Sequence, residues 1–380
     1  MQSILTQKNK LKGKKVLLRL SLNVPVDDGK VINDFKLEKI LPTIEFLRNE
    51  GAKVLILGYA EKKKDTLTPV GEYFKQFLPA GRQVLSFKFV ENILDEKNRE
   101  IISEMKGGGV ILFENLKKYN EEVNNNEEFS KIIASLGDIY VNEAFPDSHR
   151  KYSSIIGVPK LMESYFGPLF IKETESLCCV GETQALKLLV LGGNKLKTKL
   201  PFVKKFLEIT DYVFVGGSLA NDFFKLKGYE VGESLVSNGD FGLEEVLNNK
   251  KIILPIDVIV QNPEGIFERK VNEVLKDDVI LDAGPRTIQL LEEKIKQSKF
   301  VLWNGPIGDY KTGFIEGTLG LAQAIAGSDA ESVAGGGDTV FCIDKLGLKD
   351  KFDFLSTGGG AMLEYISNKT LVGIEAVKNK

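Results

Sequence analysis

The sequence predicts an α/β protein with two doubly wound, Rossmann-like parallel-sheet domains that are joined by a hinge helix. The chain has 380 residues, which is more than a single hydrophobic core usually organises. Short runs rich in Val, Ile and Leu alternate with amphipathic segments, as expected for buried parallel strands covered by helices. Near residues 160–175, the positions that follow these runs change from polar and charged to glycine-rich. We therefore expect two domains with different roles.

The expected strands and helices alternate along the whole chain. In the first half, apolar runs predict strands at residues 14–22, 52–60, 109–116 and 137–145. In the second half, they predict strands at residues 186–193, 211–217, 251–260, 300–306, 331–337 and 352–360. Apolar residues recur about every three to four positions in 36–51 and 198–210, which predicts amphipathic helices. The linker that acts as the hinge is expected within residues 161–177.

The composition excludes several classes of protein. Lys and Arg number 51 and Asp and Glu number 53, which argues against binding to nucleic acid or a membrane surface through bulk charge. Cys178, Cys179 and Cys342 fit neither a disulfide framework nor a zinc site, and they favour a reducing compartment. His149 is the only histidine, so a histidine-rich metal site is excluded. No apolar run reaches the length of a membrane span, and we expect a cytoplasmic protein.

Glycine clusters follow five of the expected strands in the second half. Their sequences are GGNK, GGSLAN, NGPIG, GGGDT and TGGGA. Any one of them could be an ordinary turn, but together they predict a nucleotide site in which backbone amides and helix N-termini face phosphates. Lys195 and Lys199 are four residues apart, so on a helix both ammonium groups face one side, as phosphate ligands or as solvated surface. Asp338 could reach Mg²⁺ or could be a simple helix cap.

Basic residues follow the expected strands in the first half. If these strand ends meet at one edge of a sheet, they form a cleft for a small, multiply charged anion. A basic domain combined with a nucleotide domain suggests phosphoryl transfer, in which positioning and charge stabilisation supply most of the catalysis. The residues concerned are Lys36, Lys62, Lys63, Lys64, Lys117, Lys118 and Arg150.

The chain resembles the phosphoglycerate kinase family over almost its whole length. Nine strings carry the resemblance in the family order: RLSLNVP, ENLKKY, LGDIYVNEAF with HR, LGGNKLKTK, GGSLAN, LPIDV, WNGPIG, GGGDT and LSTGGGAMLE. The resemblance implies a two-domain hinge enzyme that transfers phosphate reversibly between 1,3-bisphosphoglycerate and Mg·ADP, giving 3-phosphoglycerate and ATP. It implies a monomer that binds these small molecules, with Mg²⁺ carried by the nucleotide.

The resemblance also implies how the chain is divided. Residues 1–165 would form the basic substrate domain, and the C-terminal tail, about residues 367–380, would return to it. Residues 166–366 would form the nucleotide-binding domain. The nucleotide ligands implied are Gly193, Lys199, Gly216, Gly217, Asn304, Gly305, Pro306, Lys311, Gly336, Gly337, Asp338 and Thr339, with Asp338 also next to the metal. The catalytic residues implied are Lys36, Lys195, Lys199, Gly359 and Gly360, and the substrate ligands are Ser21, Asn23, Lys36, Tyr59, Lys62, Lys117 and Arg150.

Departures from the family pattern lie mostly in the substrate half. Ser21 replaces an aspartate that binds the triose, Tyr59 replaces a histidine, and Lys36, Lys62 and Lys117 replace arginines. In the nucleotide half, Lys311 stands near the place of a glutamate that binds ribose, with Asp309 as the nearby carboxylate. A lysine keeps the positive charge but lacks the planar fork of arginine, so slower turnover is expected. Two alternatives remain open: a related enzyme that phosphorylates another carboxylate, and a catalytically silent nucleotide-binding protein.

Overall fold

The computed structural model describes residues 1–77, 87–178, 186–239 and 241–378. The chain forms two compact units, one made of Met1–Leu177 with Asn368–Lys380 and the other of Cys178–Ser367. The sequence analysis placed its boundary between residues 165 and 166, within the first of these units. Cys179 and the last two residues of the expected C-terminal segment lie outside the described residues. No helix among the described residues has the length and apolar character needed to cross a lipid bilayer.

The first unit contains a six-stranded parallel sheet in the order β5-β6-β4-β1-β7-β8. Its strands are β1 Lys15–Arg19, β4 Lys53–Leu57, β5 Phe87–Val90, β6 Val110–Phe113, β7 Ile139–Asn142 and β8 Ser164–Phe166. A short hairpin pairs β2 Val26–Asp27 with β3 Lys30–Val31. The helices are η1 Ile4–Lys10, α1 Phe35–Asn49, α2 Thr68–Phe77, α3 Lys97–Glu104, η2 Leu116–Lys118, α4 Asn120–Val123, α5 Glu127–Ala134, η3 Phe145–Asp147, η4 Ser153–Gly157, η5 Val158–Lys160, α6 Pro168–Cys178 and α14 Val372–Lys378.

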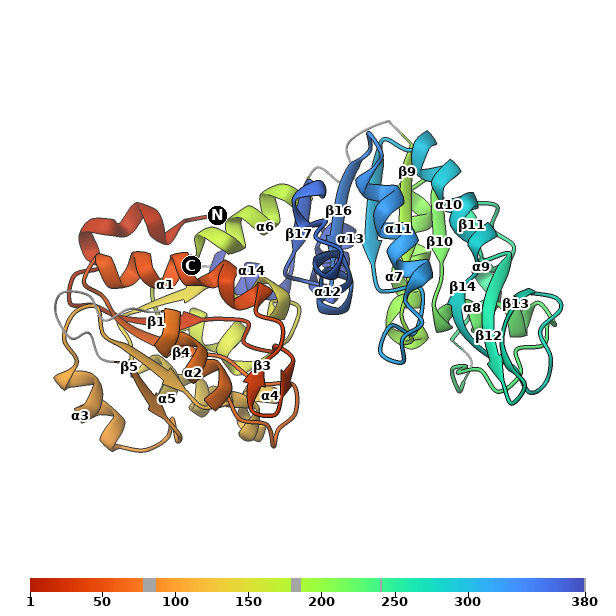
Figure 1. The fold of residues 1–380 in the computed structure, drawn as a ribbon. Helices are drawn as coiled ribbons and strands as arrows, with labels where there is room; N and C mark the ends of the chain where they lie inside the picture. The colour runs from red at the N-terminus through yellow and green to blue at the C-terminus, as the bar shows by residue number, and fades with distance from the viewer. Residues whose placement is uncertain (78–86, 179–185, 240, 379–380) are drawn as a thin grey trace. The chain divides into compact units, whose positions relative to one another are not determined.

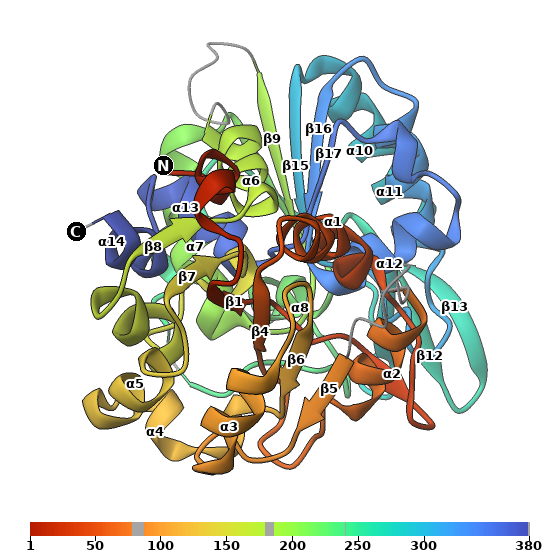
Figure 2. The same ribbon diagram turned by 90° about the vertical axis from the view of Figure 1, so that its left-hand side faces the viewer.

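The terminal helix α14 packs within the first unit, although it lies far from the rest of that unit in sequence. It contacts β8, next to which it is drawn in blue (Figure 2). The backbone N–H of Gly373 donates to the carbonyl of Ser148 at 2.8 Å. A side chain at position 373 would lie 2.8 Å from the Ser148 side chain, so glycine permits this close approach.

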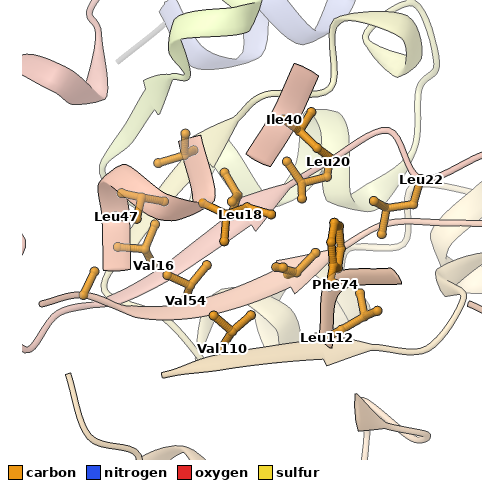
Figure 3. Packing of buried hydrophobic residues seen from close by; sticks show 14 of the residues in the cluster. Val16, Leu18, Leu20, Leu22, Ile40, Leu47, Val54, Phe74, Val110 and Leu112 are labelled. Carbon is orange, nitrogen blue, oxygen red and sulfur yellow. The ribbon is translucent and has the colours of Figure 1, made fainter. Parts of the chain in front are cut away.

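The core of the first unit follows from the period-two alternation of its central strand. Val16, Leu18 and Leu20 lie on one face of the β1 segment and are fully buried. Figure 3 shows them next to Ile40 and Leu47 of α1, whose spacing places both on one side of that helix. Each such fully buried aliphatic side chain stabilises the fold by about 1.5–3 kcal/mol.

The second unit contains another six-stranded parallel sheet, in the order β11-β10-β9-β15-β16-β17. Figure 1 shows its green and blue strands, from opposite ends of the unit, in one sheet. Its strands are β9 Lys187–Leu191, β10 Tyr212–Val215, β11 Ile252–Ile253, β15 Phe300–Asn304, β16 Glu331–Gly335 and β17 Phe354–Ser356. The helices are α7 Leu196–Ile209, α8 Ser218–Leu226, α9 Glu244–Leu247, α10 Pro285–Gln297, α11 Glu316–Ala326, α12 Gly337–Lys345, η7 Lys349–Lys351 and α13 Gly360–Asn368.

An antiparallel sheet in the second unit was not predicted. It has the order β13-β12-β14, with β12 Asp257–Asn262, β13 Gly265–Lys270 and β14 Val279–Ala283. The single strand expected at residues 251–260 is wrong, because this run forms β11 in the parallel sheet and β12 in the antiparallel one. Pro255 lies between them, and the next backbone N–H, of Ile256, donates to the Thr287 hydroxyl rather than to a strand. The predicted fold class itself is confirmed by the two parallel sheets.

Each parallel sheet has a point where the strand order reverses. In the second unit the chain adds β10 and β11 on one side of β9 and then β15, β16 and β17 on the other. In the first unit the corresponding point lies between β1 and β7. Ligands of such sheets bind outside the carboxyl ends of the strands at this reversal. We therefore expect ligand-binding sites at the loops after β1 and β7 in the first unit and at those after β9 and β15 in the second.

Candidate active site

A cavity of about 450 Å³ lies in the second unit at this reversal. The loops after β9, β10 and β15 contribute to its wall, together with α8 and β14. Five of the expected nucleotide ligands line it: Gly193, Gly217, Pro306, Lys311 and Asp338. The other seven lie outside its lining: Lys199, Gly216, Asn304, Gly305, Gly336, Gly337 and Thr339. Gly216 faces packed side chains instead, since a Cβ there would lie 2.7 Å from Phe214 and 2.9 Å from Ile307.

The Lys199 ammonium lies between the two loops that flank the reversal. Its Nζ donates to the carbonyl of Gly192 after β9 and, at 3.2 Å, to that of Asn304 at the end of β15. Burial lowers the pKa of Lys199 to about 8, an effect that the charge of Asp338 opposes. Gly305 has φ +99°, and a Cβ there would lie 2.7 Å from Lys199 Nζ. Glycine is therefore required at position 305 for both the backbone conformation and the position of the ammonium group.

Lys195 and the helix N-termini surround the same region. Lys195 is the exposed residue that precedes α7, four residues before Lys199. The helices α12 and α13 begin at Gly337 and Gly360, and a Cβ on Gly359 would lie 3.2 Å from the Cα of Gly336. The two N-termini therefore lie close together. Such ends attract anions, because their first backbone N–H groups have no partner within the helix.

The side chains of Asn304 and Thr339 connect the loops after β15 and β16 by hydrogen bonds. The Asn304 amide donates to the carbonyl of Gly335 at 2.7 Å, and the Thr339 hydroxyl accepts from the N–H of Gly305 at 2.8 Å. Both side chains are buried. They therefore hold the shape of the site. Beside them, a Cβ on Gly337 would meet no atom within 4 Å, so the start of α12 faces open space.

Asp338 has a partner that sequence reasoning missed. The Tyr310 hydroxyl donates to Asp338 Oδ1 at 2.6 Å, and both side chains line the cavity. Asp282 of β14 also lines it, and burial raises the pKa of that carboxyl to about 7. Tyr310 lies just after WNGPIG and could have been suspected from that position. Asp282 carried no signal, because β14 was not predicted.

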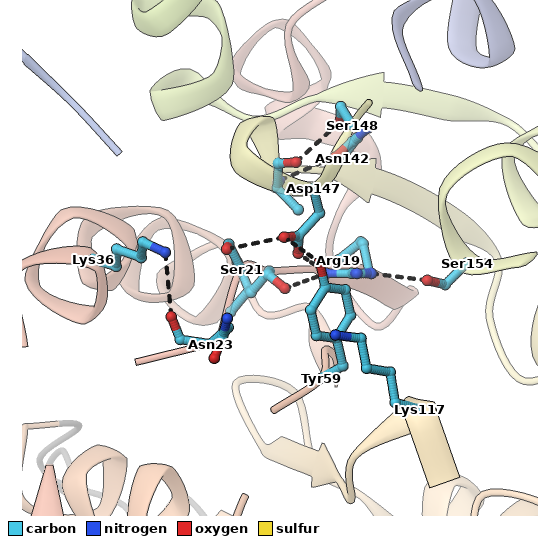
Figure 4. Close-up of polar contacts among 12 residues, drawn as sticks. Arg19, Ser21, Asn23, Lys36, Tyr59, Lys117, Asn142, Asp147, Ser148 and Ser154 are labelled. Carbon is cyan, nitrogen blue, oxygen red and sulfur yellow. Dashed lines mark hydrogen bonds and ion pairs between the residues drawn. The ribbon is translucent and has the colours of Figure 1, made fainter. Parts of the chain in front are cut away.

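In the first unit, a buried polar cluster occupies the corresponding reversal between β1 and β7. Figure 4 shows the Asp147 carboxylate at its centre. Asp147 Oδ1 accepts from the Ser21 hydroxyl at 3.3 Å and from the Tyr59 hydroxyl at 2.8 Å, while Arg19 Nη1 donates to Oδ2 at 2.9 Å. Arg19 Nε donates to Ser154 Oγ at 2.8 Å, and the guanidinium lies 5.0 Å from the centre of the Tyr59 ring. The expected residues Ser21 and Tyr59 are thus brought together by Asp147.

Among the remaining expected substrate ligands, Lys117 contacts this cluster, and Lys36 contacts Asn23. Lys117 Nζ lies 4.0 Å from the centre of the Tyr59 ring and donates to the carbonyl of Glu61 at 3.0 Å. Burial lowers the pKa of Lys117, and the charge of Asp147 opposes this effect. Lys36 Nζ donates to the carbonyl of Asn23 at 3.2 Å.

Other cations of the first unit are exposed. Lys62 and Arg150 have exposed side chains, and the charge of Arg150 reaches Lys117. The neighbouring Lys118 pairs with Glu114 at 2.8 Å, and Lys63 donates to Asn120 at 2.8 Å. Burial lowers the pKa of the lone histidine, His149, to about 4, so it is neutral at physiological pH. Lysine and arginine therefore supply the positive charge.

The sequence analysis missed Arg19 and Asp147. Both are buried, with side-chain exposures of 0% and 5%. Asp147 belongs to the run AFPDSHR, two positions before His149, but nothing in the sequence indicated that it reaches Ser21, which is 126 positions earlier. The topology explains the contact, because Arg19 at the end of β1 pairs with Asn142 at the end of β7.

A family model described as phosphoglycerate kinase matches residues 6–369. The chain belongs to the phosphoglycerate kinase family. It is 36% identical to the phosphoglycerate kinase of Dictyoglomus turgidum and 35% identical to that of Clostridium novyi, in each case over 97% of both chains. The structure is similar to that of the Pyrococcus horikoshii phosphoglycerate kinase, with a TM-score of 0.85, 31% identity and coverage of 97% of this chain and 96% of that one.

A second solved structure, the phosphoglycerate kinase of Coxiella burnetii, gives a TM-score of 0.78 at 32% identity, covering 99% of this chain and 98% of that chain. These comparisons confirm the resemblance to the phosphoglycerate kinase family. They do not favour either alternative, an enzyme for another carboxylate or a catalytically silent protein.

Proposed function

We propose that the two units bind different substrates of the phosphoglycerate kinase reaction: the first unit binds the triose, and the second binds the nucleotide. The reaction transfers phosphate between 1,3-bisphosphoglycerate and Mg·ADP, giving 3-phosphoglycerate and ATP. The observation that carries the proposal is that each unit has a polar or charged cluster at the reversal of its own parallel sheet. The cluster around Lys199 suits phosphates, and the cluster around Asp147 lies among the expected triose ligands.

The proposed nucleotide site combines a cavity that has an apolar part with a phosphate-binding end. Phe224, Leu235 and Ile307 line the cavity and suit the nucleobase. The phosphate chain would lie towards Lys195, Lys199 and the N-termini of α12 and α13. There, cationic groups and backbone N–H groups stabilise charge without reorganising during the transfer. Gly359 and Gly360 contribute through these N–H groups, because they have no side chains to block them.

Asp338 suits the Mg²⁺ that family members use with the nucleotide. Its side chain is exposed at the cavity, next to the open space at Gly337. In the described part of the chain, His, Cys, Asp and Glu side chains form no group of three or more that could hold a metal. Asp338 would therefore hold the ion together with phosphate oxygens and water, as is usual for Mg²⁺ beside nucleotides. When bound, the ion neutralises phosphate charge.

The proposed triose site carries cations for the anionic ends of the substrate. Lys36 and Lys117 are partly buried, and Lys62 and Arg150 are exposed. Each can offer donors to a carboxylate or a phosphate. In the second unit, Lys199 would stabilise the phosphoryl group during transfer, which depends almost entirely on positioning and charge.

A coupled assay in the ATP-forming direction tests the proposal, with ADP, Mg²⁺ and 1,3-bisphosphoglycerate. We expect turnover that requires all three, together with calorimetric binding of 3-phosphoglycerate and of Mg·ADP to the full chain. Folded protein that binds neither ligand would contradict it.

We also propose a monomer in the cytoplasm, which fits the small-molecule reaction and the buried thiol of Cys342. Sedimentation of the purified chain checks the monomer.

Tyr310→Phe is expected to weaken the binding of Mg·ADP about three- to tenfold, because Asp338 loses the hydrogen bond that orients it. The binding of ADP in the presence of a chelator should stay unchanged, since phenylalanine keeps the ring that packs on Phe341. Calorimetric titrations with and without Mg²⁺ measure both affinities. Asp338→Asn is the matched comparison and should show a larger loss that is also confined to Mg·ADP. Equal weakening of both ligands would mean that Tyr310 acts on the nucleotide itself.

Binding of Mg·ADP is expected to take up a proton at about pH 8.5 but not at about pH 6.5. The pKa of Lys199 is lowered to about 8 by burial, so at the higher pH most of this lysine is neutral before binding. A neighbouring phosphate favours the charged form and raises the pKa. Calorimetry in two buffers with different ionisation enthalpies measures the uptake. Lys199→Met should abolish it, and equal heats in both buffers for the unaltered protein would contradict the expectation.

A further inference from the structure

Asp147 is a buried carboxylate that the proposed reaction does not itself use. The exposed fractions of Asp147, Ser21 and Tyr59 are 4%, 3% and 5%, so bulk water has little access to any of them. Asp147 Oδ2 accepts from Arg19, and Oδ1 accepts from the two hydroxyls. An ion pair with Arg19 alone would not require the second oxygen to accept from two side chains, one after β1 and the other after β4.

These hydrogen bonds fix the direction in which each of the two hydroxyl groups donates its proton. A serine or tyrosine hydroxyl has one proton, and in each case that proton points at Asp147 Oδ1. Burial and the charge of Asp147 raise the pKa of Tyr59 well above its usual value, so the phenol keeps its proton. Ser21 and Tyr59 can then offer only lone pairs. A ligand group that meets them must be a hydrogen-bond donor.

The cations around this cluster have the opposite property. Ammonium groups such as those of Lys36 and Lys117 donate and cannot accept. A ligand that suits the whole set therefore needs anionic groups and one neutral donor. At neutral pH, 3-phosphoglycerate has a carboxylate, a phosphate and a single donor, its 2-hydroxyl group.

We propose that Asp147 is a positioning residue that makes Ser21 and Tyr59 hydrogen-bond acceptors for the 2-hydroxyl group of the triose. This inference rests on the proposed function, and it identifies the feature that the site selects: a hydroxyl next to the carboxylate. The fold brings the Asp147 carboxylate to Ser21. Because the Ser21 hydroxyl donates its proton to this carboxylate, its oxygen can only accept a hydrogen bond from the ligand. Since the acceptors are buried, a ligand without the hydroxyl leaves them unpaired, which is costly.

The test compares 3-phosphoglycerate with 3-phosphonooxypropanoate, which has the same carboxylate and phosphate but lacks the hydroxyl. Calorimetry with the full chain should show that the deoxy compound binds about ten- to a hundredfold more weakly. In Asp147→Asn, the single amide oxygen is required by Arg19, so the amide NH₂ faces Ser21 and Tyr59 and their protons turn outward. The ratio of the two affinities should then fall to about one. Mg·ADP affinity should stay unchanged and shows that the variant is folded.

A merely structural role for Asp147 predicts another result, in which both triose ligands weaken equally and the ratio is kept. That outcome would overturn the inference. Tyr59→Phe and Ser21→Ala each remove one acceptor and keep the ion pair with Arg19, so each should reduce the ratio even if Asp147→Asn does not fold. An unaltered protein that turns over 1,3-bisphosphoglycerate but binds the deoxy compound as tightly as 3-phosphoglycerate would overturn this inference alone. Absence of turnover and of 3-phosphoglycerate binding would overturn the proposed function and the inference with it.

Discussion

Lys199→Met is expected to lower kcat about a hundred- to a thousandfold, because it removes a preorganised cation from the phosphate-binding end of the nucleotide site. Two carbonyl groups accept hydrogen bonds from this ammonium group, and glycine at position 305 leaves the space that it occupies. A neighbouring lysine therefore cannot easily take its place. Methionine keeps much of the length of the side chain but removes both the charge and the N–H groups that donate to the Gly192 and Asn304 carbonyls. The coupled assay at saturating ADP and 1,3-bisphosphoglycerate measures the effect.

Lys205→Met is the matched control for this change. Lys205 lies on the same helix, α7, but its ammonium is exposed and pairs with Glu208 at 2.9 Å. Such surface pairs contribute little, and we expect kcat to stay within about twofold. Similar rates for the two variants would mean that Lys199 does not act on the transferred phosphate.

Asp147→Ala is expected to lower the free energy of unfolding of the first unit by about 3–5 kcal/mol, because it leaves the buried Arg19 guanidinium without its carboxylate partner. The Ser21 and Tyr59 hydroxyls lose their acceptor as well. Glu122 is hydrogen-bonded to Arg19 through Ser154, and its charge also acts on Arg19, so it compensates for the loss in part. Urea denaturation followed by circular dichroism measures the loss.

The position of the single tryptophan provides an internal comparison. Trp303 is buried in the second unit, so its fluorescence follows that unit. The fluorescence transition should shift less than the transition seen by circular dichroism. Asp27→Ala, at an exposed position of β2, should change stability by no more than about 0.5 kcal/mol. An unchanged unfolding midpoint in Asp147→Ala would show that the Arg19 pair contributes nothing to stability.

Much of the fold could be predicted because a strand buried on both faces is a continuous apolar run. The runs around β1, β9 and β15 are examples, and each ends in residues that belong to a candidate site. The antiparallel sheet could not be predicted in the same way. The strand β13 is largely exposed and has little apolar alternation, and Pro255 divides a run that otherwise reads as one strand.

The two sites differed in how well the sequence predicted them. Glycines such as Gly305 and Gly337 indicated the nucleotide site, because a missing side chain after a buried strand is visible in the sequence itself. The partners Tyr310 and Asp147 were missed, because their roles depend on side chains 28 and 126 positions away. Hydrogen bonds over such distances leave no local pattern.

The sequence by itself determined the two-sheet architecture, the family and the strand ends that carry glycine or positive charge, since periodicity and residue type are local properties. Only the tertiary structure decided which of these residues meet. Pairing of β1 with β7 brings Asp147 to Ser21, and pairing of β9 with β15 brings Lys199 to Asn304. The order of strands in a sheet is set by the packing of the whole chain, and it therefore cannot be seen in any single segment.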